Sequence, residues 1–204
     1  MSRLRRSYHH GDLRSALLDE VGHIIREQGV GVVSVREVAR RASVSHGAPA
    51  HHFGNKSGLL TAFAVQGFEQ LALRIETALA AARPAPPQQL AAIGKAYVLF
   101  AVNNPQHFEV MFPGTLIDQS DEAYVQASER CRGPLIAIVT RAAKEGYVDG
   151  DPRIVGAAAW SLVHGLASLW PSGQVQMMTG SDDAERVAEA ITRLFVTKVL
   201  DGRR

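Results

Sequence analysis

The polar side chains between Ser34 and Lys56 are suited to contacting a nucleic acid. Hydroxyl, imidazole, guanidinium and ammonium groups donate hydrogen bonds to phosphate oxygens and to base edges in the DNA grooves. Lys56 stands at the expected start of a helix, where the helix N-terminus and its own ammonium group both suit a phosphate. The short or polar candidates for such contacts are Arg36, Arg40, Ser45, His46, Gly47, His51, His52 and Lys56.

Two short helices joined by a tight turn must position these side chains. Ser34, with Glu37 three residues later, matches a capping box at the start of the first helix. Ser43 lies in the turn, and Ser45 is the expected N-cap of the second helix. A basic helix followed by a short polar helix is typical of a helix-turn-helix, whose second helix enters a DNA major groove.

Three sequence blocks around this motif resemble the DNA-binding domain of TetR-type transcriptional repressors. They are YHHGDLRSALLD from Tyr8, SVREVARRASVS from Ser34 and HHFGNKSGLL from His51, in the family's order and spacing. The resemblance carries DNA-binding roles onto Arg36, Ser45, His46, His51, His52 and Lys56. It also assigns the basic arm at residues 1–8, through Arg3, Arg5 and Arg6, to the adjacent minor groove.

The chain departs from the family pattern at three positions of the motif. Ser43 replaces a glycine that suits a positive φ, which costs about 1 kcal/mol. Ala50 replaces a tyrosine that bonds to a phosphate, and His51 replaces an arginine and so lacks a permanent charge. We therefore expect DNA binding that is weaker and less dependent on salt, and we expect Ala50→Tyr to tighten it.

Positive charge is concentrated at the end of the chain that carries the motif. Residues 1–60 hold 9 Lys and Arg against 5 Asp and Glu, whereas residues 61–204 hold 13 against 15. Such a local excess is expected of a surface that binds phosphates. The single cysteine, Cys131, cannot form an internal disulfide, which is typical of the reducing cytoplasm. We therefore expect a cytoplasmic protein.

No segment has the pattern expected for secretion or for crossing a membrane. The basic N-terminus is followed by no apolar region of the kind found in signal peptides. Residues 154–170 lack charge, but at 17 residues they are short for a membrane span and include His164. A helix buried in a protein interface is the better interpretation, so we expect no membrane partner.

The whole chain predicts an all-α fold of about nine helices without a sheet. Its domains are predicted to be a three-helix DNA-binding bundle at 1–62 and a helical effector-binding and dimerisation domain at 63–204. The expected helices lie at about 13–28, 35–41, 46–53, 55–82, 88–103, 106–111, 120–145, 151–170 and 181–199. The prolines at 83–88 predict a loop, Gly133-Pro134 predicts a kink or break, and Ser181 is the expected cap of the last helix.

The uncharged helix carries Trp160, with His164 and Gly165 one turn later. This spacing resembles a subgroup of TetR-type proteins whose effector domain has a Trp-His-Gly motif. An aromatic and sulfur-containing cavity would take an apolar or amphipathic small molecule, oriented by one polar group. The residues predicted to line it are Tyr97, Phe100, Phe108, Met111, Phe112, Trp160 and His164. Alternatively, His164 only bonds to a buried partner, and the aromatic residues are plain core.

The last two long helices bear more apolar surface than one subunit needs. In the family these helices form the dimer as a four-helix bundle. The predicted interface residues are Ala158, Leu162, Val187, Ile191 and Phe195. A twofold dimer would bind a palindromic DNA site.

The predicted function is a homodimeric repressor, not an enzyme, that binds a palindromic operator and is released by a small-molecule effector. The resemblance implies that the effector acts by displacing the fourth helix. A DNA-silent sensor or interaction protein of the same fold is the alternative. A small hydrolase is a third interpretation, although the chain has no G-x-S-x-G elbow. We expect no cofactor and no metal, because the histidine pairs lack metal-ligand spacing.

Overall fold

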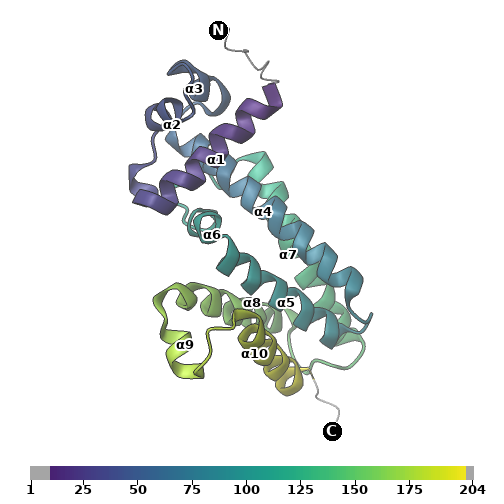
Figure 1. The fold of residues 1–204 in the computed structure, drawn as a ribbon. Coiled ribbons are helices and arrows are strands. Elements are labelled where there is room, and N and C mark those ends of the chain that lie inside the picture. Colours follow the sequence, from purple (N-terminus) through teal and green to yellow (C-terminus); the bar gives the residue numbers. More distant parts are fainter. Residues whose placement is uncertain (1–9, 201–204) are drawn as a thin grey trace. The chain divides into compact units, whose positions relative to one another are not determined.

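A computed structural model of the chain describes residues 10–200, and within them every regular element is helical. Ten α-helices and two 3-10 turns follow one another without a strand in this range, which confirms the all-α prediction (Figure 1). The predicted basic arm at residues 1–8 lies outside the described residues. The elements are α1 (His10–Gln28), η1 (Val30–Val32), α2 (Val35–Arg41), α3 (Gly47–Phe53), α4 (Lys56–Ala81), α5 (Pro86–Asn103), α6 (Pro105–Met111), α7 (Glu122–Lys144), α8 (Pro152–Leu169), η2 (Trp170–Ser172), α9 (Gln174–Thr179) and α10 (Ala184–Val199).

The chain folds into two compact units. The first holds the described residues up to 66 together with 106–125, and the second holds 67–105 and 126–200. The long helices α4 and α7 contribute residues to both units. Segments distant in sequence are therefore joined in each unit: α6 belongs with α1 to α3, and α5 belongs with α8 and α10.

The core of the first unit forms between α1 and the first half of α4. Leu17, Val21 and Ile24 follow one another at helical spacing and are fully buried. On α4, Phe63 is 1 % exposed, and its ring lies 3.5 Å from the position a Cβ on Gly22 would take. Phe63 thus packs directly over Gly22, at a distance where a Cβ would make an ordinary van der Waals contact.

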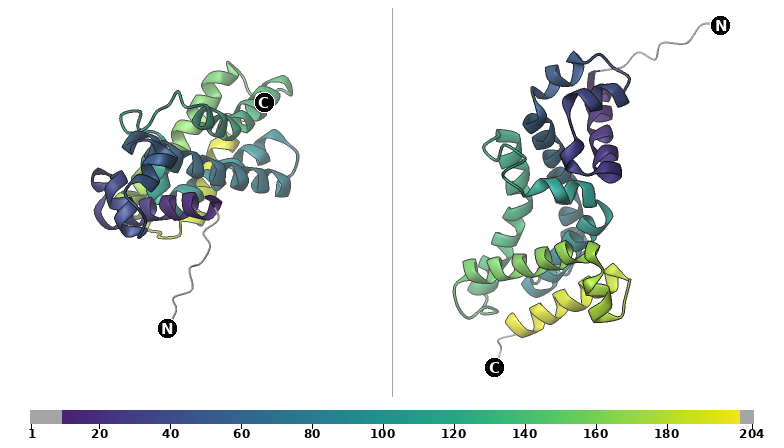
Figure 2. Two further views of the ribbon diagram at one scale, coloured as in Figure 1. Left: turned by 90° about the horizontal axis from the view of Figure 1, so that it is seen from above. Right: turned by 90° about the vertical axis from the view of Figure 1, so that its left-hand side faces the viewer.

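The core of the second unit forms where α5, α8 and α10 pack against one another (Figure 2). Gly94 of α5 lies at this junction. A Cβ there would come within 2.9 Å of Thr192 on α10 and 3.3 Å of Val163 on α8. Thr192 is 5 % exposed, and its hydroxyl donates to the Ala188 carbonyl of its own helix at 2.8 Å. The buried hydroxyl is therefore satisfied without interrupting the helix contact.

Several predicted boundaries are wrong where proline or a neighbouring cap decided them. The loop predicted over 83–88 ends earlier, because Pro86 occupies the first turn of α5, where its missing N–H needs no partner. α7 continues through Pro134 as one helix. Asp183, not Ser181, caps α10 by accepting a hydrogen bond from the Arg186 amide at 3.0 Å. The short helix α9 was not predicted at all.

Candidate DNA-binding and effector sites

α2 begins at the predicted N-cap, Ser34, but the Glu37 carboxylate of the predicted capping box bonds to Arg40 and Arg41 instead. Ser34 is the N-cap, and its hydroxyl accepts a hydrogen bond from the Glu37 amide at 3.1 Å. Val38 and Ala39 are fully buried on the inner face of the helix. The Glu37 carboxylate accepts hydrogen bonds from the side chain of Arg40. α2 is thus capped at its start and anchored by its apolar face.

The turn after α2 has the positive φ at position 43 that the family resemblance implies. Ser43 has a φ of 55°, and it is the non-glycine residue with positive φ within the described part of the chain. The prediction that Ser45 caps α3 is wrong. His46 holds the N-cap position without a side-chain bond, and Ser45 instead uses its carbonyl to accept from the Ala48 amide at 3.0 Å. The turn that leads into α3 is therefore closed by a backbone hydrogen bond that begins two residues before the helix.

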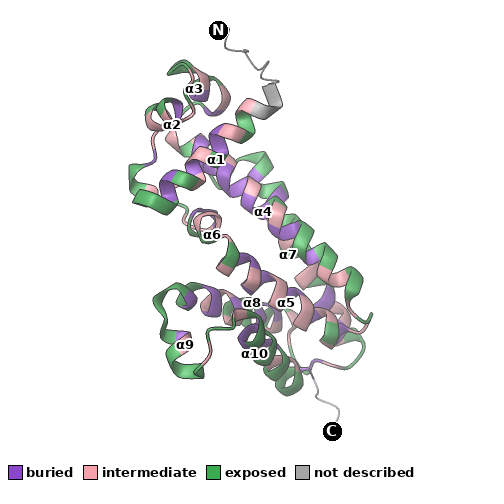
Figure 3. Cartoon of the chain, in the orientation of Figure 1, coloured by how far each residue is buried: buried purple, intermediate pink, exposed green. Residues whose placement is uncertain are grey.

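α3 turns its polar residues to solvent and its apolar residues inward (Figure 3). Pro49 and Phe53 are buried and hold the helix to its unit, and the Arg14 guanidinium lies 5.4 Å from the centre of the Phe53 ring. The exposed residues are Ser45, His46, Gly47, Ala50 and His51, and His52 is half-buried. The residues predicted to reach DNA from α3 and from the turn before it are thus all at least partly open to solvent.

The predicted phosphate-binding cations differ in their surroundings. Arg36 is exposed, and the Arg40 side chain is 66 % exposed but paired with Glu37. The Lys56 ammonium donates to the carbonyls of Val30 at 3.4 Å and Gly31 at 3.0 Å. Sequence reasoning missed the Lys56 bonds, since nothing in the spacing relates positions 56 and 31.

α6 is attached to α4 within the first unit by a half-buried histidine. The His107 ring stacks on Phe63 with 4.0 Å between ring centres and 16° between planes, and it hydrogen-bonds to the Gln66 side chain at 3.1 Å. Burial lowers the pKa of His107 to about 4, so the ring is neutral at pH 7. Sequence reasoning did not identify this role, because the contact joins residues 44 positions apart in the chain.

The loop after α6 has its own bond to α4. The Thr61 hydroxyl accepts from the Asp118 amide at 2.8 Å and donates to the Ser57 carbonyl at 2.8 Å. Thr61 is 3 % exposed. The loop is therefore fixed to α4 at a buried position. Losing either hydrogen bond there would leave a buried polar group without a partner.

Three of the predicted effector residues come together in the second unit. The Tyr97 hydroxyl hydrogen-bonds to Nδ1 of His164 at 2.8 Å, and the Trp160 and His164 rings are 5.3 Å apart. Burial raises the pKa of Tyr97 well above its usual range and lowers the pKa of His164. Both groups are thus held in their neutral forms. Trp160 remains 45 % exposed, so the cluster reaches the surface of α8.

The other predicted effector residues are divided between the units. Phe108 and Phe112 belong to the first unit, where their rings meet at 5.3 Å in an edge-on contact. Phe100 and Met111 are fully buried.

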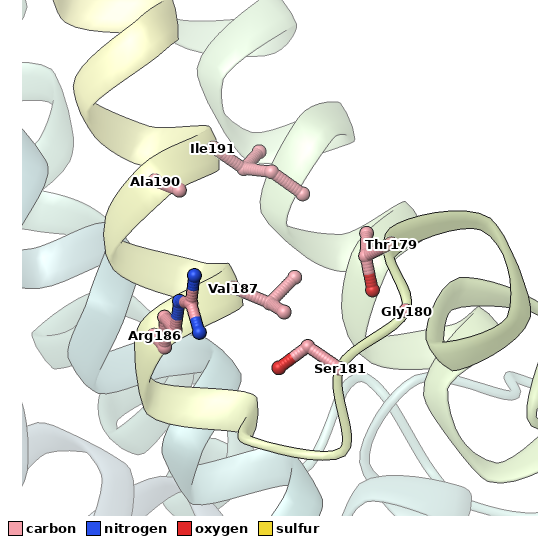
Figure 4. A pocket seen from close by; sticks show the side chains of 7 residues that line it. All are labelled: Thr179, Gly180, Ser181, Arg186, Val187, Ala190 and Ile191. Carbon is pink, nitrogen blue, oxygen red and sulfur yellow. The ribbon is translucent and has the colours of Figure 1, made fainter.

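A groove of about 250 Å³ lies elsewhere, between the end of α9 and α10 (Figure 4). Its lining consists of Thr179, Gly180, Ser181, Arg186, Val187, Ala190 and Ile191, and so includes two predicted dimer residues but none predicted for the effector.

The predicted dimer helices present apolar side chains to solvent. Of the predicted set, Ala158 is exposed, Leu162, Ile191 and Phe195 are half-buried, and Val187 is buried. Further apolar residues missed in that set are more exposed: Ile154 at 68 % on α8 and Leu194 at 60 % on α10. Residues 152–172 meet the length and hydropathy of a membrane span, so the prediction that this segment is too short is wrong, and 28 % of its 18 most apolar consecutive residues are buried. Such an uncovered apolar helix is also what a subunit interface requires.

Two features of the described residues concern what a metal site and a reactive cysteine require. Within residues 10–200, no three His, Cys, Asp or Glu side chains are grouped so that they could hold a metal ion. The Cys131 thiol donates to the Phe68 carbonyl at 3.1 Å, and burial raises its pKa to about 12. A thiol with so high a pKa has little thiolate and is a poor nucleophile at pH 7.

Two family models match the chain, one in its N-terminal part and one in its C-terminal part. Residues 90–195 match the family model described as "Tetracyclin repressor-like, C-terminal domain", and residues 17–63 match "Bacterial regulatory proteins, tetR family". The HTH-type transcriptional regulator BetI of Paraburkholderia phytofirmans is 43 % identical over 49 residues, which is 24 % of this chain and 25 % of BetI. The chain thus matches about a quarter of that curated relative.

Solved structures match over nearly the whole chain. A protein of unknown function from a Rhodococcus species is 30 % identical with a TM-score of 0.81, covering 96 % of this chain and 100 % of the other. The TetR family transcriptional regulator PfmR from Thermus thermophilus has a TM-score of 0.70 at 24 % identity, covering 92 % of this chain and 98 % of PfmR. At 24 % identity, the similarity to PfmR shows a shared fold only.

Proposed function

Because this chain belongs to the tetracycline repressor-like family of transcriptional regulators, we propose that it is a repressor released from its operator by a small-molecule effector. The observation that carries this proposal is the exposed polar face of α3. Buried Pro49 and Phe53 hold that helix, and Ser34 caps the helix before it. Such a rigid, solvent-facing second helix fits a DNA major groove.

In the proposed complex, α3 supplies the contacts to base edges and its neighbours supply contacts to phosphates. Ser45, His46, Gly47, His51 and His52 lie on or beside α3 and would meet the groove. Arg36, Arg40 and Lys56 would meet the backbone, with Lys56 exchanging its carbonyl partners for a phosphate. The arm at residues 1–8 would add charge.

The effector site is proposed around Tyr97, Trp160 and His164. Tyr97 is buried and bonded to His164, while the Trp160 ring is partly exposed beside them. Neutral aromatic groups with one hydroxyl and one imidazole suit an apolar or amphipathic molecule that carries a single hydrogen-bonding group. The rest of the predicted set, Phe100, Phe108, Met111 and Phe112, is divided between the two units. In the alternative interpretation, His164 serves only as the hydrogen-bond partner of Tyr97.

The response to the effector is proposed to pass through α4. Thr61, Phe63 and Gln66 of that helix are tied to the segment 107–118 by two hydrogen bonds and a ring stack. A shift of α6 would therefore act on the helix that packs against Gly22 of α1. An effector that binds one arrangement better would change the population able to match the operator.

The homodimer is proposed to form through α8 and α10, as a four-helix bundle that supports binding to a palindrome. Exposed Ile154 and Leu194 would be covered there, beside Ala158, Leu162, Val187, Ile191 and Phe195. Covering this surface removes the apolar area that a lone subunit leaves in water.

The test is an electrophoretic shift with DNA from around the chain's own gene at low salt. We expect retardation by the purified protein, tighter retardation by Ala50→Tyr, and release by a member of a panel of metabolites and drugs. Ala50 is exposed on α3, so a tyrosine there has room to reach a phosphate. Absence of any shift, for both proteins, would contradict the repressor proposal.

A DNA-silent sensor of the same fold is the second candidate. It is favoured by the intramolecular partners of Arg40 and Lys56, two of the cations on which DNA binding would depend. In that case the ligand panel would change the protein's thermal unfolding while no DNA fragment is retarded.

A further inference from the structure

The carboxylate of Glu37 holds two arginines of its own helix. Arg40 donates to it from Nε at 2.8 Å and from Nη2 at 2.6 Å, and Arg41 donates from Nε at 3.1 Å. Arg41 also donates from Nη1 to Glu27 of α1 at 2.8 Å. Glu27, Glu37, Arg40 and Arg41 thus form one ionic cluster, which joins α1 to the first helix of the helix-turn-helix.

The two arginines occupy different positions in this cluster. Arg41 is 17 % exposed and bridges carboxylates of two helices, so it ties α2 to α1. Arg40 is 66 % exposed and is held by Glu37 of its own helix. Arg40 is therefore the member of the cluster that can face an approaching phosphate.

We propose that Glu37 lowers the affinity of this protein for DNA by offsetting the charge of Arg40. The inference rests on the proposed function, in which Arg40 contacts the DNA backbone. Two N–H groups of the Arg40 guanidinium already bond to Glu37, and the carboxylate lies beside any phosphate that the remaining N–H groups could reach. Such a pair attracts a phosphate less than a lone cation does, and it releases fewer counterions on binding.

The offset is permanent near neutral pH. Hydrogen bonds from Arg40 and Arg41 lower the pKa of Glu37 to about 2, so the carboxylate keeps its charge throughout the physiological range. The effect is thus a fixed property of the DNA-binding surface and not a pH response.

The test measures binding of the full chain to a short DNA duplex of random sequence, between about 50 and about 200 mM salt. Non-specific binding is suitable because it depends on charge and does not require the operator. We expect Glu37→Gln to bind about threefold to tenfold more tightly at the lower salt concentration. The salt dependence should be steeper by about 0.9 in log–log slope for each subunit that contacts DNA.

Two further variants separate this effect from a general change of charge. In an Arg40→Gln background, Glu37→Gln should change the affinity less than about twofold, because the exposed cation whose charge Glu37 offsets is gone and only Arg41, 17 % exposed, still bonds to position 37. Glu27→Gln removes one negative charge from the same cluster but leaves the Glu37–Arg40 pair intact, so it should have a much smaller effect than Glu37→Gln. Equal gains from these two variants, or no gain from Glu37→Gln, would overturn the proposal.

Folding is followed by circular dichroism, since Glu37 also supports α2. If Glu37→Gln does not fold, single variants of the arginines decide. Arg40→Gln should then weaken DNA binding by less than Arg36→Gln does, because Arg40 already has its charge offset; the reverse order would overturn the proposal. A wild-type protein that binds no DNA at low salt would instead count against the proposed function as a whole.

Discussion

Ser43 occupies the turn of the helix-turn-helix with a φ of 55°. A side chain is strained in this region of backbone space, where glycine is not. We predict that Ser43→Gly raises the free energy of unfolding by about 1 kcal/mol and the melting temperature by roughly 2–4 °C. Ala42→Gly is the matched control: Ala42 has an ordinary φ of −70°, so a glycine there should lower stability.

His107 is expected to make the free energy of unfolding decrease as the pH falls. Its pKa is lowered to about 4 by burial, below the ordinary value of about 6.5, so the unfolded chain takes up a proton more readily. This contribution is fully present above pH 6.5 and is lost as the pH falls toward 4. We predict a loss of about 2–3 kcal/mol over that range, measured by urea unfolding.

His107→Phe should remove that part of the pH dependence while keeping a ring against Phe63. His46→Gln is the control for the loss of a histidine, since His46 is exposed at the start of α3. Equal slopes for the wild-type protein and His107→Phe would show that the burial of His107 does not govern acid unfolding.

Features that depend on neighbouring residues could be predicted from the sequence, whereas contacts between residues distant in the chain could not. The Ser34 cap is encoded within a few neighbouring residues, so the local pattern predicted it, whereas the positive φ at Ser43 was implied by the family resemblance. The partners of Lys56, Phe63 and Thr61 lie 25 to 57 positions away in the chain. Only the folded chain brings such groups together.

Among the elements, the helices were predicted well in their number and interior and less well at their ends. Apolar periodicity marks a helix core clearly, but the first residue depends on which of several candidate caps is used. Asp183 is the N-cap of α10, because its side chain accepts a hydrogen bond from the Arg186 amide. The Ser181 hydroxyl instead accepts a hydrogen bond from the Asp183 amide. α9 has six residues, which is too short for a periodic signal.

The junction between α3 and α4 depends on Gly58. A Cβ at this position would lie 2.1 Å from the Phe53 carbonyl oxygen, and that atom belongs to the backbone. We predict that Gly58→Ala destabilises the protein by about 2–3 kcal/mol in denaturant unfolding, because backbone must shift to remove the clash.

Gly47→Ala is the control for this prediction within the same motif. Nothing lies within 4 Å of the Cβ position at Gly47, so the change in stability should be within about 0.5 kcal/mol. A loss at Gly58 no larger than that at Gly47 would refute the steric interpretation.

At the scale of the whole molecule, the proposed dimer predicts a specific sensitivity to charge on α10. Leu194 is 60 % exposed, and in the proposed bundle it would be covered by the second subunit. Leu194→Glu would bury a carboxylate without a partner, so we predict a monomer by light scattering and weaker retardation of DNA.

Leu73→Glu is the matched control, because Leu73 is 55 % exposed on α4, outside the proposed bundle. It should remain a dimer and bind DNA as the wild-type protein does. A dimeric Leu194→Glu protein would move the interface away from α10.

The Lys56 ammonium, held by the carbonyls of Val30 and Gly31, has a consequence for the speed and cost of recognition. A free lysine loses side-chain entropy when it binds, at a cost of about 0.5–1.5 kcal/mol. Lys56 is ordered when the chain folds, long before any phosphate arrives. The loss of side-chain motion therefore belongs to folding, and the cost at the encounter with DNA is the exchange of two carbonyl partners for a phosphate.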